Sequence, residues 1–238
     1  VTLAGGVTAD AAATARQGSV NVGLAVFDFH VPTPGIVIGG AGKATEATAR
    51  GVLTGAGNDT GSSAARIDAD ASTHAAATTV SVNIAEFSAD LAPDLPSLPS
   101  LGASLVVADT ATVATARAYA IDAGAGRDTV DHTGEVESSA DATAGAVGVA
   151  GTVDVEYRAG ESLFAIDAIG VRADTTADAA AAGIAGGDGA DRLDNTGHVA
   201  ADASADANSV AVGVVASGSL RGNGGALNLA ATEASAVG

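Results

Sequence analysis

The chain has 238 residues and a formal net charge of −18, and its many apolar residues are mostly small, with only two Tyr and four Phe and no Met, Trp or Cys. The acidic balance excludes a nucleic-acid partner, because phosphate binding needs clustered Lys and Arg, and the lack of Cys excludes disulfides and thiol chemistry. A core restricted largely to Ala and Val must be thin, which favours a narrow layered or solenoidal body over a thick globule.

Apolar and polar residues alternate from Val7 onward, where Val7, Ala9 and Ala11 share one parity and polar residues fill most of the other. A period of two residues predicts a β-strand with one buried face. The same alternation returns at 67–71 and at 199–205. So many alanines would also suit a helix, but their fixed alternation with Thr, Ser and Asp favours a strand.

A second kind of segment is apolar on both parities. The segments that follow the alternating one in successive copies are 18–29, 79–87, 146–153 and 209–217, and the two interpreted as apolar on both parities are 18–29 and 209–218. A strand that is apolar on both faces is usually covered on both. We therefore expect a cover on its outer side, formed by the loop that follows or by a partner surface.

Loops of variable length are predicted near 28–37 and 88–104. The first contains HVPTPG and the second LAPDLPSLPSLG, and their prolines argue against regular structure. Insertions at one place in each unit are the usual way in which solenoids carry surface loops.

Glycine motifs mark an internal repeat. GAGNDT begins at Gly55, GAGRDT at Gly124 and GDGADR at Gly187, so the motifs lie 69 and 63 residues apart. We interpret residues 1–238 as a single array, cut from a longer one, of about four imperfect units. The units are 1–54 (partial), 55–123, 124–186 and 187–238 (partial). Three strand-like segments per unit predict three coils of roughly 20 residues each, although one wide coil per unit also fits.

The motif at Gly186, Gly187, Gly189, Asp191 and Leu193 fits the nonapeptide G-G-x-G-x-D-x-U-x in full. Partial copies comprise Gly124, Gly126, Asp128 and Val130, and Gly55, Gly57 and Asp59. The sequences NTGHV and HTGEV are similar to coils of autotransporter and haemagglutinin β-helices. The chain thus resembles the RTX (haemolysin-type) and autotransporter-like repeats of large secreted bacterial adhesins and surface filaments. This resemblance implies an all-β fold, a parallel β-solenoid that we expect to be a right-handed β-helix, located outside the bacterial cell or on its surface.

The resemblance also implies calcium at Asp59, Asp128 and Asp191. In the RTX family, calcium lies between the Gly-Asp turns of neighbouring coils, where carbonyl and carboxylate oxygens bind it. One wide coil per unit would stack the motifs at about 5 Å, whereas three coils per unit would separate them. The alternative is that the glycines form tight turns with positive φ and that each Asp bonds its own turn backbone. The predicted turn glycines are Gly55, Gly57, Gly124, Gly126, Gly186, Gly187 and Gly189.

Candidate sites for chemistry are few. The sequence has no nucleophile elbow or Walker loop, so we expect no enzymatic activity and no cofactor other than calcium. His132 and Asn195 occupy equivalent positions and are interpreted as one stacked polar ladder. An ice-binding array at Thr110, Thr112 and Thr115 and a polysaccharide-active β-helix enzyme are less favoured alternatives.

The combined pattern predicts a structural role. We expect a stalk, an adhesin shaft or a self-assembling surface filament, in which the partner is another copy stacked end to end through its strand edges. A calcium-responsive RTX-type adhesin segment is the alternative. The sequence contains no run of 18 apolar residues, so we expect no membrane span. The sequence does not define an adhesive ligand such as a surface or a polysaccharide.

Overall fold

The protein is all-β in its computed structural model, which describes residues 2–3, 5–27, 35–87, 100–156, 163–219 and 225–237. These residues form fifteen strands and no helix, and every strand pairing among them is parallel. The predicted parallel β-solenoid is therefore confirmed. No helix in the described part is long and apolar enough to cross a membrane.

Each repeat forms one wide coil. A two-residue strand, β1 (Thr2–Leu3), precedes the first coil, which comprises β2 (Val7–Phe27), β3 (Gly35–Leu53), β4 (Ala56–Gly57) and β5 (Thr60–Ser63). The second coil comprises β6 (Ile67–Phe87), β7 (Ser100–Asp122), β8 (Ala125–Gly126) and β9 (Thr129–His132). The third comprises β10 (Val136–Glu156), β11 (Leu163–Ala185), β12 (Asp188–Gly189) and β13 (Arg192–Asn195). The fourth comprises β14 (Val199–Ser219) and β15 (Gly225–Val237).

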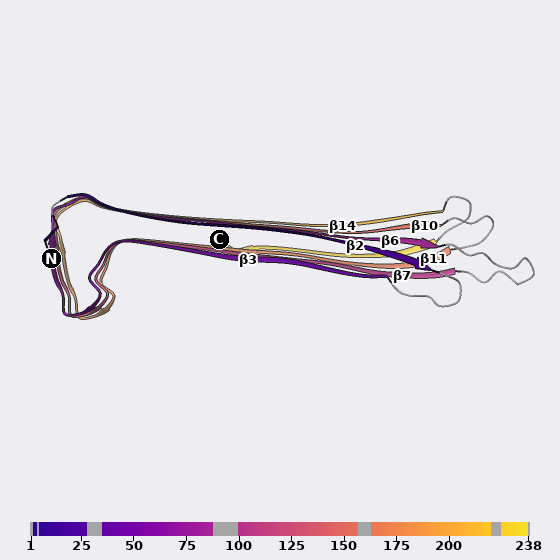
Figure 1. Cartoon of the computed structure of the whole chain (residues 1–238), viewed down its shortest axis with the longest axis horizontal. Coiled ribbons are helices and arrows are strands. Elements are labelled where there is room, and N and C mark those ends of the chain that lie inside the picture. Colours follow the sequence, from indigo (N-terminus) through magenta and orange to yellow (C-terminus); the bar gives the residue numbers. More distant parts are fainter. Residues whose placement is uncertain are drawn as a thin grey trace, which may run out of the picture.

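Equivalent strands of successive coils form four sheets. Sheet 1 has the order β14-β10-β6-β2 and sheet 2 the order β15-β11-β7-β3. These two long sheets lie against each other as a flat blade (Figure 1). The two narrow sheets, β12-β8-β4 and β1-β5-β9-β13, form a wider head at one end of the blade (Figure 1).

The prediction of three short coils in each unit is wrong. The alternating segment and the apolar segment after it are not separate strands, because both belong to one strand of 21 residues in each coil. No glycine turn or proline separates the two segments, so the extended backbone continues through both. The third strand-like segment of each unit, which precedes the glycine motif at 45–51 and at 111–120, belongs to the returning strand of sheet 2.

The core is a thin layer of alanine between the two sheets. Ile67 and Ala71 are completely buried and Ala69 is 3% exposed, which confirms the inward parity predicted for this segment. Sheet 2 contributes equally small side chains, among them Ala116 and Ala118. The two backbones approach closely, as the composition predicts, and small residues are required where they do.

The apolar half of sheet 1 does not have the two-sided cover that its sequence predicts. Among the described residues nothing packs over its outer face, where Val20 is 74% exposed and Val214 is 52% exposed. Its inner face is buried but carries small and polar side chains, including Ser81 and Asn83. The reason is steric, because sheet 2 supplies bulky side chains here. A Cβ on Gly148 would lie 2.9 Å from the Val171 Cγ1 atom.

Two further predictions are corrected by the strand boundaries and the side-chain directions. Residues 28–34 and 88–99 of the predicted loops lie outside the described residues, whereas 35–37 and 100–104 belong to β3 and β7. Thr110 and Thr112 point inward and are at most 1% exposed, so they cannot form a flat ice-binding array.

Candidate functional site

The glycine motifs of successive coils lie directly on one another in the head. Gly57, Gly126 and Gly189 occupy one column of the narrow sheet β12-β8-β4. The φ values of the turn glycines are +101° at Gly55, +132° at Gly57, +80° at Gly124, +144° at Gly126, +78° at Gly187 and +146° at Gly189. Gly186, the seventh predicted turn glycine, does not have a positive φ. A Cβ on Gly126 would lie 1.6 Å from the carbonyl oxygen of Gly57, so the stack leaves no room for a side chain.

The three predicted aspartates form a second column beside these turns. The backbone N–H of Asp59 donates to Oδ1 of Asp128 at 2.8 Å, and the N–H of Asp128 donates to Oδ1 of Asp191 at 3.0 Å. The carboxylates of Asp128 and Asp191 therefore bond the preceding coil rather than their own turns, which corrects the predicted local bond at these two residues. The aspartates connect the coils through their side chains.

The second carboxylate oxygen of this column is unusual. Asp128 is fully buried, and Oδ2 of both Asp59 and Asp128 has no hydrogen-bond partner among the described residues. Buried polar atoms normally have a partner, so these two oxygens are candidates for binding a proton donor or a cation.

The site fits calcium only in part. Calcium takes six to eight oxygen ligands, and the two free Oδ2 atoms would supply two of them. The carbonyl oxygens of Gly55, Gly124 and Gly126 already accept inter-coil hydrogen bonds of 2.9, 2.9 and 3.2 Å. No three His, Asp or Glu side chains in the described part of the chain are grouped so that they could hold a metal ion. A cation here would have to complete its shell with water.

His132 lies in a polar ladder at the corner between the head and sheet 1. It pairs in register with Ser63 below and Asn195 above, as the equivalence of His132 and Asn195 predicts. The imidazole is fully buried. Burial lowers the pKa of His132 below its ordinary value, and the nearby backbone of Gly134 and Glu135 opposes that shift.

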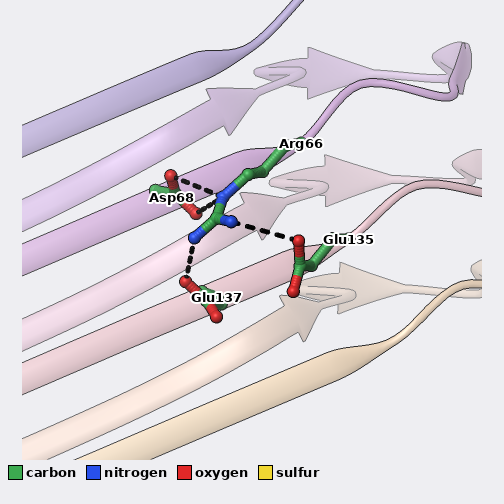
Figure 2. Close-up of polar contacts among 4 residues, drawn as sticks. All are labelled: Arg66, Asp68, Glu135 and Glu137. Carbon is green, nitrogen blue, oxygen red and sulfur yellow. Dashed lines mark hydrogen bonds and ion pairs between the residues drawn. The ribbon is translucent and has the colours of Figure 1, made fainter.

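An exposed ion-pair cluster lies where the strands of sheet 1 begin (Figure 2). The guanidinium of Arg66 contacts Asp68 of its own coil, with Nε 3.0 Å from Oδ2. It also reaches the next coil, where Nη1 lies 3.2 Å from Oε2 of Glu135 and Nη2 lies 2.5 Å from Oε2 of Glu137. The hydrogen bond to Asp68, then its charge and those of the two glutamates, raise the pKa of Arg66 above its ordinary value.

Similar ion pairs recur across the coils of sheet 2. Arg50 Nε lies 2.9 Å from Oδ2 of Asp122, and Arg117 contacts Glu46 in one neighbouring coil and Asp178 in the other. Sequence reasoning missed all of these pairs. Aligning the repeats could have found the first cluster, because Arg66 and Glu135 each immediately precede the first residue of a strand of sheet 1.

Comparison with known protein families, characterised proteins and solved structures finds no match for this chain. Its function must therefore be argued from the arrangement of its own residues.

Proposed function

We propose that the chain is a shaft segment of an extracellular bacterial repeat protein, which forms a stalk or surface filament by stacking coils end to end. The observation that supports this most strongly is the continuity of the strand ladders. Sheets 1 and 2 each pass through four coils in register, with no offset between equivalent positions in sheet 1. Such a body bears load along its axis through inter-coil hydrogen bonds.

The ion pairs and the aspartate column add to this continuity. Arg66, Arg50 and Arg117 each connect one coil with the next. The fully buried Asp128 does the same inside the head. Side chains therefore reinforce the same axis that the backbone hydrogen bonds define, as a shaft requires.

Stacking of a further copy is the proposed mode of growth. In the outermost coil the inward residue Val7 is only partly buried, whereas its equivalent Ile67, which has a coil on each side, is completely buried. A further coil in register would bury the same column at the edge of the array. It would also pair the free N–H and C=O groups of the outermost strand.

Two lysine substitutions on β14 test end-to-end stacking. Ala203 has inward parity and Ser204 has outward parity on this strand, and both are exposed at the edge of the array. Lys at 203 would be enclosed if another coil packed on β14, whereas Lys at 204 would remain in solvent. In electron micrographs we expect rods or filaments for the wild type and for Ser204→Lys, and shorter particles for Ala203→Lys. Compact particles for the wild type at every concentration would refute the proposed function.

A calcium-responsive segment is the second candidate function, and the buried Oδ2 atoms of Asp59 and Asp128 favour it. A calcium concentration 100 times the dissociation constant would stabilise the folded state by about 2.7 kcal/mol. Asp128→Asn removes the charge but keeps an oxygen for the N–H of Asp59, and Asp131→Asn is the matched exposed control. Urea unfolding with and without calcium should show stabilisation of the wild type and of Asp131→Asn only. No stabilisation of the wild type would reject the calcium site.

A further inference from the structure

The two faces of sheet 1 exchange polarity part-way along its strands. Near the head, alanines face inward and Asp10, Asp70 and Asp202 occupy one outward column. Toward the opposite end the outward column is Val20, Val80, Val149 and Val212. We call the outward apolar residues of this second half the outer valine face. It comprises Val20, Val22, Leu24, Val80, Val82, Ile84, Val147, Val149, Val153, Val210, Val212 and Val214.

The outer valine face is exposed and uncharged. Among its members Val20 is 74% exposed, Val212 is 40% and Val214 is 52%. The outer face of sheet 2 is also apolar at this end, where Ile36 is 59% exposed and Ile38 is 69% exposed, and its apolar area ends at the charged column of Asp109 and Arg172.

The connections at this end of the blade are too short to cover the whole face. Residues 28–34 join β2 to β3, residues 88–99 join β6 to β7, residues 157–162 join β10 to β11 and residues 220–224 join β14 to β15. Even the longest connection, with twelve residues, spans only about 40 Å when fully extended. After roughly 10 Å is used to cross between two packed sheets, it could reach back about 15 Å over the width of one strand before returning. Most of the cover must come from another molecule.

We infer that the outer valine face binds the same face of a second copy of this chain, with the strands of the two copies antiparallel. The residues of the face are all aliphatic, so the face has no group that could pair with a charged partner. Two such faces can pack as the inner layers of a sheet sandwich, with side chains interdigitating across about 10 Å. A two-fold arrangement uses the same residues on both copies.

The distribution of charge selects the antiparallel direction. With heads on the same side, the acidic columns that include Asp70 and Asp202 would lie directly opposite their copies. With heads on opposite sides, the strands of the partner extend past the centre of the face toward the acidic half for only about 20 Å, taking a rise of about 3.3 Å per residue. Asp70 lies about 36 Å from that centre by the same measure. The two acidic halves are then kept apart.

The area predicts a weak, reversible pair. Four strands at about 4.8 Å and seven residues at about 3.3 Å give a face of roughly 450 Å² in projection. Two copies would bury about 900 Å² by this measure, which is the range of transient complexes. Because each chain has a net charge of −18, we expect added salt to strengthen the pair by screening repulsion.

Sedimentation velocity over a concentration series tests the pairing. Val80→Thr, Val149→Thr and Val212→Thr together replace three of the four valines of one column with an isosteric residue that also favours strands. We expect the dissociation constant of the lateral pair to rise at least tenfold in this triple variant and to stay unchanged in Val113→Thr, an exposed valine on sheet 2. All variants in this experiment also carry Ala203→Lys, so that end-to-end stacking does not contribute. Failure of the lateral pairing can therefore be distinguished from failure of the end-to-end stacking.

Spin labels test the direction, because the chain has no native Cys. Labels at Thr78→Cys and Ser72→Cys, both exposed on the outer side of β6, should lie about 20 Å and about 60 Å from their copies in an antiparallel pair. In a parallel pair both distances would be short. Short distances at both positions, a concentration-independent monomer, or a pair unaffected by the triple substitution would each overturn the inference. Binding of the monomer to phosphatidylcholine vesicles in place of self-association would also overturn it, and would assign the face to lipid.

Discussion

Replacing Ile67 with Ala tests whether the alternation of β6 defines the inside of the blade. Ile67 is completely buried, lies between Val7 and Val136 in its column, and packs against the backbone of β3 at Gly51. The substitution removes three carbons, which is worth about 2.4 kcal/mol of transfer free energy at 0.8 kcal/mol each. The cavity left behind raises the expected loss of unfolding free energy to about 3–4 kcal/mol.

The matched control lies on the other face of the same strand. Ile84 is 38% exposed and points outward, so Ile84→Ala should cost less than about 1 kcal/mol. Ile67→Val reproduces the residue of the neighbouring coils and should cost about 0.5–1.5 kcal/mol. Urea unfolding followed by circular dichroism, at a concentration where the protein is monomeric, measures all three. Equal losses for Ile67→Ala and Ile84→Ala would refute the assignment of inner and outer faces.

Three further predictions concern the head and its edge. Gly126→Ala should prevent stable folding or lower the free energy of unfolding by more than about 3 kcal/mol, because the φ of Gly126 is +144° and the stacked backbone leaves no space for a side chain. The control is Ala125→Gly at the neighbouring exposed position, which should cost about 1 kcal/mol or less. Urea unfolding measures both variants. Burial lowers the pKa of His132 in the folded state, so the histidine of the unfolded chain is protonated first as the pH falls. The free energy of unfolding of the wild type, measured relative to that of His132→Asn, should therefore decrease as the pH drops below about 6.5. Parallel pH profiles of the two proteins would contradict this. Arg66→Gln should lower the melting temperature at low salt and have less effect at high salt, whereas Arg192→Gln, which loses a single contact of 3.6 Å, should change it less at either salt.

The repeat, the strand character and the inward alanines could be predicted from the sequence, because they are encoded locally. Alternation with a period of two defines the two sides of a strand over a few residues, as at Val7–Ala11 and Ile67–Ala71. The turn positions were equally local, since six of the seven predicted glycines have a positive φ that other residues avoid.

The width of the coil depended on the tertiary structure. Whether residues 67–87 form one strand or two depends on pairing with β2 and β10, which are about 60 to 70 residues away in the chain. The same pairing stacks the glycine motifs and directs each aspartate of the column to its neighbouring coil. Local patterns contain no information on such partners.

The direction of the apolar half of sheet 1 could not be predicted from the sequence. The bulky residues share one parity there, with Ser, Asn, Ala and Gly mostly on the other, and this pattern by itself would place the bulky residues inward. The structure places the valines outward because bulky Val106, Ile169 and Val171 of sheet 2 already fill the space between the sheets. Sequence alone determined that the chain is a repetitive, thin, strand-built array. Long-range pairing and steric fit between the two sheets decided that each repeat is one wide coil and that an apolar surface faces outward.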